Sequence, residues 1–376
     1  MDFSLTEEQE MLRDSIARFI DTDYNFETRQ EIAAKKSGFS SEMWQMFAEL
    51  GWTAVLFSEE DGGFDGGPIE LMLMMEQFGR GLVVEPFLAN IVLAGGVLRR
   101  SANPIQKSAW LKPLIEGNLH AALAFAEPQS RYDIHNVSTT AKSKGSDFVI
   151  NGRKTMVLNG GVADILIIPA RTSGKNVDEK GISLFAVPAD ANGVKISSYP
   201  TIDALQAAEI ELIDVTISSD SVLGLPDLGF SVLSEVIDEA TLAISAEAVG
   251  IMQTMHDKTV EYSKNRSQFG VPIGTFQALQ HRMVDTMTDC EQTRSLMYWC
   301  VMRNAAKSPN ARQTINALKY QVGTAGILVA REAVQLHGGM GVTWELDIAH
   351  YFKRITAIDL TFGNADYHLD KFIDPQ

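Results

Sequence analysis

The sequence predicts a mostly α-helical protein with a central β domain. Apolar residues recur with helical periodicity in residues 1–120 and again in residues 226–376. Between these segments, residues 121–225 contain short apolar runs rich in Val, Ile and Phe and separated by turn residues. A chain of 376 residues, 45% of them hydrophobic and 21% charged, is long enough to form two or three cores. We therefore expect, with these boundaries, an N-terminal helical domain, a middle β domain built as a barrel or as packed sheets, and a C-terminal helical bundle.

Three helices and a glycine-rich loop are expected near the N-terminus. Thr6 and Gln9 have the spacing of a capping box, so the first helix begins there. A second helix is predicted over residues 41–50. Residues 61–68 are rich in glycine and predict a loop, and a third helix follows over residues 69–78. The side chains expected to face inward are Leu12, Ile16, Phe19 and Ile20 on the first helix and Met43, Phe47 and Leu50 on the second.

The clearest β signal in the middle domain is an Asn-Gly pair between two apolar runs. Residues 147–150 and 154–158 flank Asn151 and Gly152. Because Asn-Gly favours the tight turn of a β-hairpin, we predict a hairpin that reverses at these two residues. Further short strands are predicted at residues 165–168, 182–187 and 209–212.

Small residues on a long segment predict close packing in the C-terminal bundle. A helix is expected over residues 314–337, ending where Gly338 and Gly339 can simply terminate it. His337 would then be a residue at the helix end, facing the dipole. The side chains with the spacing for helix contact are Tyr320, Gly323, Thr324 and Ile327.

Two cysteines and seven histidines offer no disulfide or metal signature. Cys290 and Cys300 fall in one helical pattern, about 15 Å apart at ~1.5 Å rise per residue, which exceeds disulfide reach. We expect both to be buried thiols. The histidines are scattered, and His368 with Asp366 and Asp370 is interpreted as a polar helix surface rather than a ligand set.

Charge and hydropathy exclude several classes of function. The net charge of −16 argues against nucleic acid, whose phosphates need a basic face. No apolar run reaches the ~20 residues of a membrane span. The acidic start lacks the basic region and apolar core of a signal peptide, so a cytoplasmic location is expected. No Gly-x-Gly-x-x-Gly follows a predicted strand, which leaves a Rossmann site unsupported.

Two segments of the C-terminal domain resemble the FAD-holding signatures of the acyl-CoA dehydrogenase family. They are residues 266–273, Arg-Ser-Gln-Phe-Gly-Val-Pro-Ile, and residues 335–341, Gln-Leu-His-Gly-Gly-Met-Gly. The order helical, β, helical is also similar, so the resemblance covers nearly the whole chain. It implies the acyl-CoA dehydrogenase fold, with a barrel-like middle domain and a C-terminal four-helix bundle, and FAD as cofactor.

The candidate cofactor-binding residues lie in and near these segments. A pyrophosphate needs a guanidinium that can hold two oxygens at once, and Arg266 is the candidate. The resemblance implies that Phe269 and Gln277 lie beside the adenosine half. It also implies that Gln335 and Gly339 form the adenine-side wall, where glycine lets the backbone come close. In the family, these residues reach the FAD whose ring lies in a neighbouring subunit.

The residues expected around the flavin ring depart from the family pattern. Ala126 stands where the family usually has threonine before Glu-Pro, and bulky residues fill positions 129–133. Met156 and Leu158 replace the usual Trp and Thr, so an indole and a hydroxyl are both absent. Together these changes predict that the chain's own ring pocket is altered or empty.

The family's catalytic glutamate is also absent. Dehydrogenation needs a carboxylate that removes the α-proton, while the flavin accepts the hydride. By resemblance, the glycine of the motif is Gly363, which puts Phe362 in the glutamate position. A second position used by some relatives is Ala240, and Glu239 beside it is rotated by about 100° on the helix. Glu239 is therefore the best candidate for a displaced base.

Other interpretations of these carboxylates stay open. Glu235, Asp238 and Glu239 together are typical of a solvated acidic helix face. Asp359, in a helix predicted over residues 351–360, is a further candidate base. The position that carries a substrate-binding arginine in some relatives is Thr241.

Three functions are compatible with this pattern. The first is a flavoprotein subunit that catalyses α,β-dehydrogenation of an acyl-CoA thioester together with a catalytically complete partner chain, as an α2β2 heterotetramer that passes electrons to an acceptor. Residues 352–364 resemble small subunits of heteromeric bacterial acyl-CoA dehydrogenases of the pimeloyl-CoA or steroid side-chain type. The second is a homomeric enzyme that uses Glu239. The third is a structural subunit without FAD.

Overall fold

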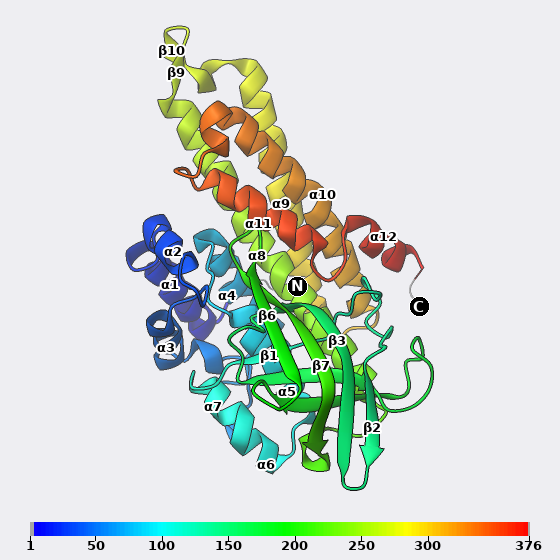
Figure 1. The fold of residues 1–376 in the computed structure, drawn as a ribbon. Helices are drawn as coiled ribbons and strands as arrows, with labels where there is room; N and C mark the ends of the chain where they lie inside the picture. The colour runs from blue at the N-terminus through cyan, green and yellow to red at the C-terminus, as the bar shows by residue number, and fades with distance from the viewer. Residues whose placement is uncertain (1–3, 375–376) are drawn as a thin grey trace. The chain divides into compact units, whose positions relative to one another are not determined.

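The computed structural model describes residues 4–374, which divide into two compact units (Figure 1). The helical unit comprises Met1–Glu31, Gly67–Val83 and Thr241–Gln376. The mixed unit comprises Ile32–Gly66 and Val84–Ala240. Each unit is therefore assembled from segments that are far apart in the sequence.

Long helices dominate the structure. The longer helices and the two C-terminal ones are α1 (Glu7–Thr22), α4 (Pro68–Gly81), α8 (Gly229–Asn265), α9 (Gln277–Ala305), α10 (Ala311–His337), α11 (Ile348–Leu360) and α12 (Ala365–Ile373). The shorter ones are α2 (Phe26–Ala33), α3 (Ser41–Glu49), α5 (Gly95–Ser101), α6 (Pro104–Gln106) and α7 (Lys112–Ile115), with a π-helix at Leu88–Ala94.

The predicted start of the first helix is confirmed. The Thr6 hydroxyl accepts a hydrogen bond from the Gln9 amide (3.3 Å), and the Gln9 side chain accepts one from the Thr6 amide (3.0 Å). The predicted helices at 41–50 and 69–78 correspond to α3 and α4. One inward assignment is wrong: Leu50 is 48% exposed, because α3 ends at Glu49 and the chain turns there through Gly51 in a left-handed conformation.

Helices α4 and α8 cross so closely that glycine is required on both. A Cβ on Gly79 would lie 2.0 Å from the Glu247 carbonyl oxygen, and one on Gly250 would lie 2.0 Å from the Glu76 carbonyl oxygen. Beside this crossing, the buried Glu247 carboxylate accepts two hydrogen bonds from Arg354 of α11, both at 2.6 Å. The core of the helical unit thus contains a paired charge that fixes α11 against α8.

The mixed unit contains an eight-stranded sheet that packs upon itself. The strand order is β6-β7-β3-β2-β4-β5-β8, with β1 parallel to β4. Between β2 and β4 the pairing is reduced to one parallel pair, Thr140 with Arg171. Side chains from both halves then meet in one buried core, which is the packed-sheet form of the predicted middle domain. The strands are β1 (Ala121–Leu123), β2 (Thr140–Lys144), β3 (Asp147–Leu158), β4 (Ile165–Arg171), β5 (Ile182–Pro188), β6 (Val194–Pro200), β7 (Gln206–Ser218) and β8 (Val222–Leu223).

The predicted hairpin at Asn151 and Gly152 is wrong. Strand β3 continues through both residues, and the chain reverses earlier, at Gly145, between β2 and β3. Gly152 is required at a register shift, because a Cβ there would lie 2.7 Å from the Thr139 Cα atom. The Asn151 side chain exchanges two hydrogen bonds with Asp214 of β7, at 3.0 and 2.9 Å. Asn-Gly therefore forms a β-bulge that lets β3 pair with the long strand β7.

Two further predictions concern the state of the cysteines and the presence of a membrane-spanning helix. Both cysteines are free and buried, as predicted. Among residues 4–374, none of the helices combines the length and apolarity needed to cross a membrane.

Candidate functional site

The first group of candidate residues lies where α8 ends. Arg266 follows α8 directly and leads into a two-stranded hairpin of β9 (Ser267–Gln268) and β10 (Val271–Pro272). Phe269 and Gly270 form its turn, both with left-handed backbones (φ of 55° and 83°). The Phe269 residue is 94% exposed, and its ring lies 6.3 Å from that of Phe276 (between centroids) and nearly perpendicular to it. The hairpin thus presents an apolar ring to the outside of the helical unit.

The second group lies at the end of α10, and one contact brings it beside the first (Figure 1). The Tyr262 hydroxyl, one turn before Arg266, donates to the His337 carbonyl (3.4 Å), and the two rings lie 4.3 Å apart. Gln335 lies on the last turn of α10, and Gly339 follows it in an exposed 3-10 helix. A Cβ on Gly339 would meet nothing within 4 Å.

The five predicted cofactor-binding residues share one property, which is exposure. Arg266, Phe269, Gln277, Gln335 and Gly339 are all on the surface of the helical unit. Within residues 4–374, the Arg266 guanidinium has no hydrogen-bond or ion-pair partner. An unpaired guanidinium beside exposed backbone without a Cβ fits the pyrophosphate and adenosine of FAD. The surrounding charge is unfavourable, since the chain carries −16, so these local donors must provide the attraction.

His337 takes no part in this surface. Its side chain is buried, and its Nδ1 atom contacts the Ala333 carbonyl oxygen at 2.8 Å. Burial lowers the pKa of His337. The residue is a helix-end histidine bound to its own helix, which agrees with its interpretation from the sequence.

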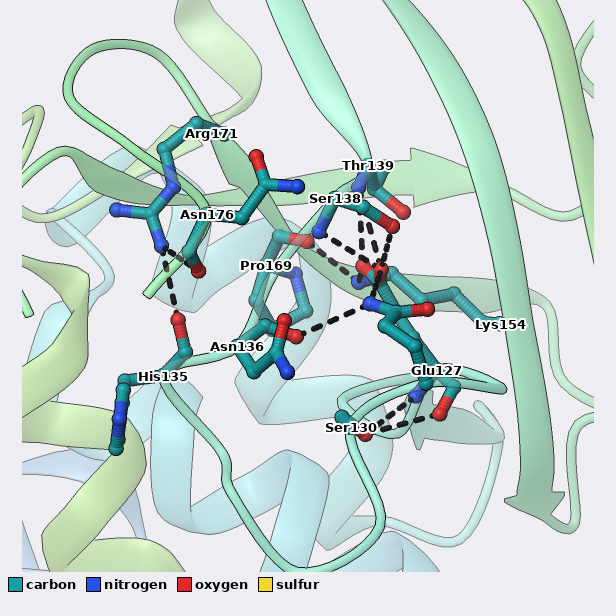
Figure 2. Close-up of polar contacts among 11 residues, drawn as sticks. Glu127, Ser130, His135, Asn136, Ser138, Thr139, Lys154, Pro169, Arg171 and Asn176 are labelled. Atoms are coloured by element: carbon teal, nitrogen blue, oxygen red, sulfur yellow. Dashed lines mark hydrogen bonds and ion pairs between the residues drawn. The ribbon is translucent and has the colours of Figure 1, made fainter. Parts of the chain in front are cut away.

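A buried carboxylate organises the loop that follows β1 (Figure 2). Glu127 accepts hydrogen bonds from Lys154 Nζ of β3 (2.6 Å), the Ser138 amide (2.8 Å) and Gln129 (2.8 Å). Lys154 also donates to the Pro169 carbonyl of β4 (2.7 Å). Although burial favours the neutral acid, the Lys154 ammonium and these hydrogen bonds lower the pKa of Glu127 to about 2. Glu127 is therefore held as an anion, and together with Lys154 it connects the segment after β1 with β3 and β4.

Arg171 holds the far side of the same loop (Figure 2). Its guanidinium donates to the carbonyls of His135 (2.9 Å) and Asn176 (2.7 Å), and also to those of Asp178 and Lys180. One arginine thus connects residues 128–139 with the loop between β4 and β5. Neither anchor was predicted, because the main partner of Glu127 lies 27 residues away on β3 and the partners of Arg171 are main-chain carbonyls.

Three of the residues expected around the flavin ring, Ala126, Met156 and Leu158, supply no side-chain hydrogen-bond donor. The Ala126 carbonyl accepts from the Thr155 amide (3.0 Å), which fixes the loop next to β3. Met156 sits at a second register shift of β3, with a left-handed backbone (φ of 51°) and 49% exposure. Leu158 lies two residues further along β3. A β-bulge can turn a side chain away from the sheet, and at this bulge the exposed side chain is that of Met156.

A polar cluster beside Met156 was not predicted. The Tyr199 hydroxyl lies 3.1 Å from the Met156 sulfur and donates to the Glu209 carboxylate (3.1 Å), which Thr155 also contacts at 2.5 Å. Burial alone would raise the pKa of Glu209, but these hydrogen bonds hold it below its usual value. The sequence showed no strand at β6, where Tyr199 lies, so the pairing of β6 with β7 could not be anticipated.

The candidate base positions contain apolar or already paired residues. Phe362 is half-buried and Ala240 is fully buried. Thr241, the position of the substrate-binding arginine in some relatives, is buried as well. The Asp359 carboxylate accepts from the amide of Ala365 (3.1 Å), the first residue of α12, whose N-cap is Asn364.

Glu239 is not part of a solvated face, which corrects that interpretation. Its carboxylate accepts from Arg99 and, at 3.1 Å, from Arg100, both at the end of α5. The Glu239 side chain is 16% exposed, whereas that of Glu235 is 66% exposed. The reason is that α5 lies along this face of α8 and covers it with two arginines.

The interpretation of His368 as part of a polar surface is also wrong. His368 is buried and contacts the Asn316 side chain (2.8 Å) and the Phe362 carbonyl oxygen (3.2 Å). No three His, Cys, Asp or Glu side chains within residues 4–374 are grouped so as to hold a metal ion.

Comparison with known proteins agrees with this architecture. Models of the N-terminal, middle and C-terminal domains of acyl-CoA dehydrogenases match residues 6–118, 122–215 and 227–373. The probable acyl-CoA dehydrogenase YngJ of Bacillus subtilis is 30% identical over 372 residues, 97% of each chain. The FAD complex of PigA superposes with a TM-score of 0.92 at 25% identity, covering 99% of this chain and 98% of that one. A chain of the ChsE4-ChsE5 complex from Mycobacterium tuberculosis superposes with a TM-score of 0.89 at 25% identity, covering 99% and 97%. The chain belongs to the acyl-CoA dehydrogenase family of FAD-dependent oxidoreductases.

Proposed function

We propose that this chain is an acyl-CoA dehydrogenase subunit that completes the FAD site of a catalytically complete partner chain. The reaction is α,β-dehydrogenation of an acyl-CoA thioester, with the electrons passed on to an external acceptor. One observation carries the proposal: the predicted cofactor-binding residues are gathered at one end of the helical unit, exposed, around an unpaired Arg266 guanidinium. Such a surface is suited to an anionic ligand held against it from outside.

The chain's own residues would bind the ADP half of the cofactor. Arg266 would hold the pyrophosphate through charge-assisted hydrogen bonds. Phe269 and Gln277 would pack beside the adenosine, and Gln335 and Gly339 would form the wall against the adenine. When bound, FAD supplies the acceptor for the hydride. The residues of this surface would bind and orient the cofactor and would take no part in the chemical step.

The proton-abstracting carboxylate is assigned to the partner. A general base must lie within hydrogen-bond reach of the proton that it removes. Phe362 and Ala240 cannot serve, and Glu239 is engaged on both oxygens by Arg99 and Arg100. The ChsE4-ChsE5 complex, to which the chain is similar, is built from two different chains, which supports an assembly of this type.

A homomeric enzyme is the second candidate, and one backbone group favours it. Ala126 is half-buried, its carbonyl accepts a hydrogen bond from the Thr155 amide, and its own amide makes no hydrogen bond within residues 4–374. Such an amide can donate to a ring carbonyl without a threonine hydroxyl. This interpretation requires Glu239 to leave its arginines. A structural subunit without FAD is disfavoured, since it has no use for the unpaired Arg266.

The Glu239→Gln substitution tests the assignment of the base. We expect turnover of the assembled enzyme with an acyl-CoA and an artificial acceptor to be unchanged, because the glutamine still bonds to the arginines and takes no part in proton transfer. Glu235→Gln is the matched control, since Glu235 lies one turn earlier on α8 and also contacts Arg100 (3.3 Å). Loss of turnover in Glu239→Gln alone would assign the base to this chain and refute the proposed division of roles.

A further inference from the structure

One face of α8 continues as far as Arg266. Lys258, Tyr262 and Arg266 are spaced four residues apart, and residues four apart lie on the same face of a helix. The Arg266 amide donates to the Tyr262 carbonyl (2.8 Å), so the helical register is kept up to Arg266. The contacts of Lys258 and Tyr262 therefore show which part of the helical unit this face meets.

The face meets the end of α10 and the segment that follows it. The Tyr262 ring lies 4.3 Å from the His337 ring (between centroids), tilted by 30°, and its hydroxyl donates to the His337 carbonyl (3.4 Å). One turn earlier, Lys258 forms an ion pair (2.8 Å) with Asp347, the N-cap residue of α11. The ring contact is the stronger tie, because Lys258 is exposed and ion pairs of exposed lysines contribute little.

The two rings lie where buried structure gives way to the five candidate cofactor-binding residues. Residues 264–272 are all exposed, and His337 is the last buried residue before the exposed residues 338–340. The β9–β10 hairpin projects beyond the ends of the long helices (Figure 1). Little packing is available to these exposed segments. The contact between Tyr262 and His337 thus links them at their base.

We infer that Tyr262 is a positioning residue of the FAD site, which sets Arg266 relative to the end of α10. Gln335 and Gly339 lie two residues before and after His337, so both groups of candidate residues are tied to the stacked rings. Because pyrophosphate and adenosine belong to one molecule, the groups that bind them gain affinity when their spacing is fixed beforehand. This inference rests on the proposed function and adds to it a residue that lies outside both motifs.

The test is FAD retention by the assembled enzyme, measured as the apparent dissociation constant from flavin absorbance after desalting at several FAD concentrations. Tyr262→Leu removes the stacked ring, and we expect it to weaken FAD binding about tenfold, within the range of couplings between contacting residues. Tyr262→Phe keeps the ring and should retain FAD nearly as the wild type does, because the hydrogen bond that it loses is long. His337→Leu removes the same contact from the other side and serves if Tyr262→Leu does not fold.

Tyr320→Leu is the matched control. Tyr320 is another half-buried tyrosine of the helical unit, on α10 about five turns before His337. Its substitution should leave FAD retention unchanged, whatever it does to the denaturant midpoint of the chain. An equal loss of FAD retention in Tyr320→Leu and Tyr262→Leu would show a general effect of destabilisation and overturn the positioning role.

A double-mutant cycle with Arg266 tests the positioning role more closely. If Tyr262 acts through Arg266, Tyr262→Leu should weaken FAD binding much less in the Arg266→Ala background than in the wild type. An equal loss in both backgrounds would mean that Tyr262 is merely structural.

The outcomes also separate the inference from the function on which it rests. Wild-type FAD retention in Tyr262→Leu, with Arg266→Ala still weakened, would overturn the inference and leave the shared FAD site intact. Wild-type retention in Arg266→Ala would overturn the proposed function and the inference together.

Discussion

The Lys154→Met substitution is expected to lower the free energy of unfolding of the mixed unit by about 3–5 kcal/mol, the range for breaking a buried ion pair. The buried Glu127 carboxylate loses the Lys154 ammonium at 2.6 Å, which is its ion-pair partner, and the Pro169 carbonyl loses the hydrogen bond from Lys154 as well. The measurement is the denaturant midpoint of the purified chain. Lys142→Met is the control, because Lys142 is exposed on the neighbouring strand β2.

Two observations separate lost charge pairing from lost packing. The double variant Glu127→Gln with Lys154→Met should recover part of the stability, since no uncompensated charge remains. The depressed pKa of Glu127, about 2 against a reference of 4.5, gives stability that is present above pH 4.5 and is lost as the pH falls towards 2. The difference between wild type and Lys154→Met should therefore narrow over this interval. A difference that stays constant would argue that the loss is one of packing.

The Arg266→Ala substitution is expected to weaken FAD retention in the assembled enzyme about 10- to 150-fold, the equivalent of a charge-assisted contact of roughly 1.5–3 kcal/mol. The fold should not change, since the guanidinium has no partner within residues 4–374. Flavin absorbance after desalting at several FAD concentrations gives the apparent dissociation constant.

Arg18→Ala is the matched control for this loss. Arg18 is an exposed arginine on α1 of the same helical unit, away from the ends of α8 and α10. A general effect of net charge on FAD binding would appear in both variants. Full FAD retention in Arg266→Ala would remove this residue from the cofactor site and with it the strongest support for the shared-site proposal.

Local sequence signals predicted much of the fold. The capping box at Thr6 and Gln9 and the apolar periodicity of the long helices depend on neighbouring residues, so they can be read from one sequence. The Asn-Gly pair was misleading, because its conformation depends on pairing with β7, some 60 residues away. Register shifts of this kind are set by long-range pairing and have no local signature.

The candidate site was predictable in its residue types and not in its environment. The motifs identified Arg266 and Gly339, but only the structure could reveal that both are exposed at the ends of α8 and α10. Glu239, by contrast, is shielded from solvent, because it pairs with arginines of α5, about 140 residues earlier in the chain. Partners so distant in sequence decide whether a carboxylate is solvated or paired.

The most direct test of the shared FAD site is the visible absorbance spectrum of this chain purified alone, after incubation with excess FAD and desalting. The surface around Arg266 holds only the ADP half in our account, so we expect a colourless protein that becomes yellow only when assembled with its partner. Stoichiometric flavin bands from the isolated chain would contradict this account. They would establish a homomer that closes its own FAD sites, with Glu239 as the next residue to substitute.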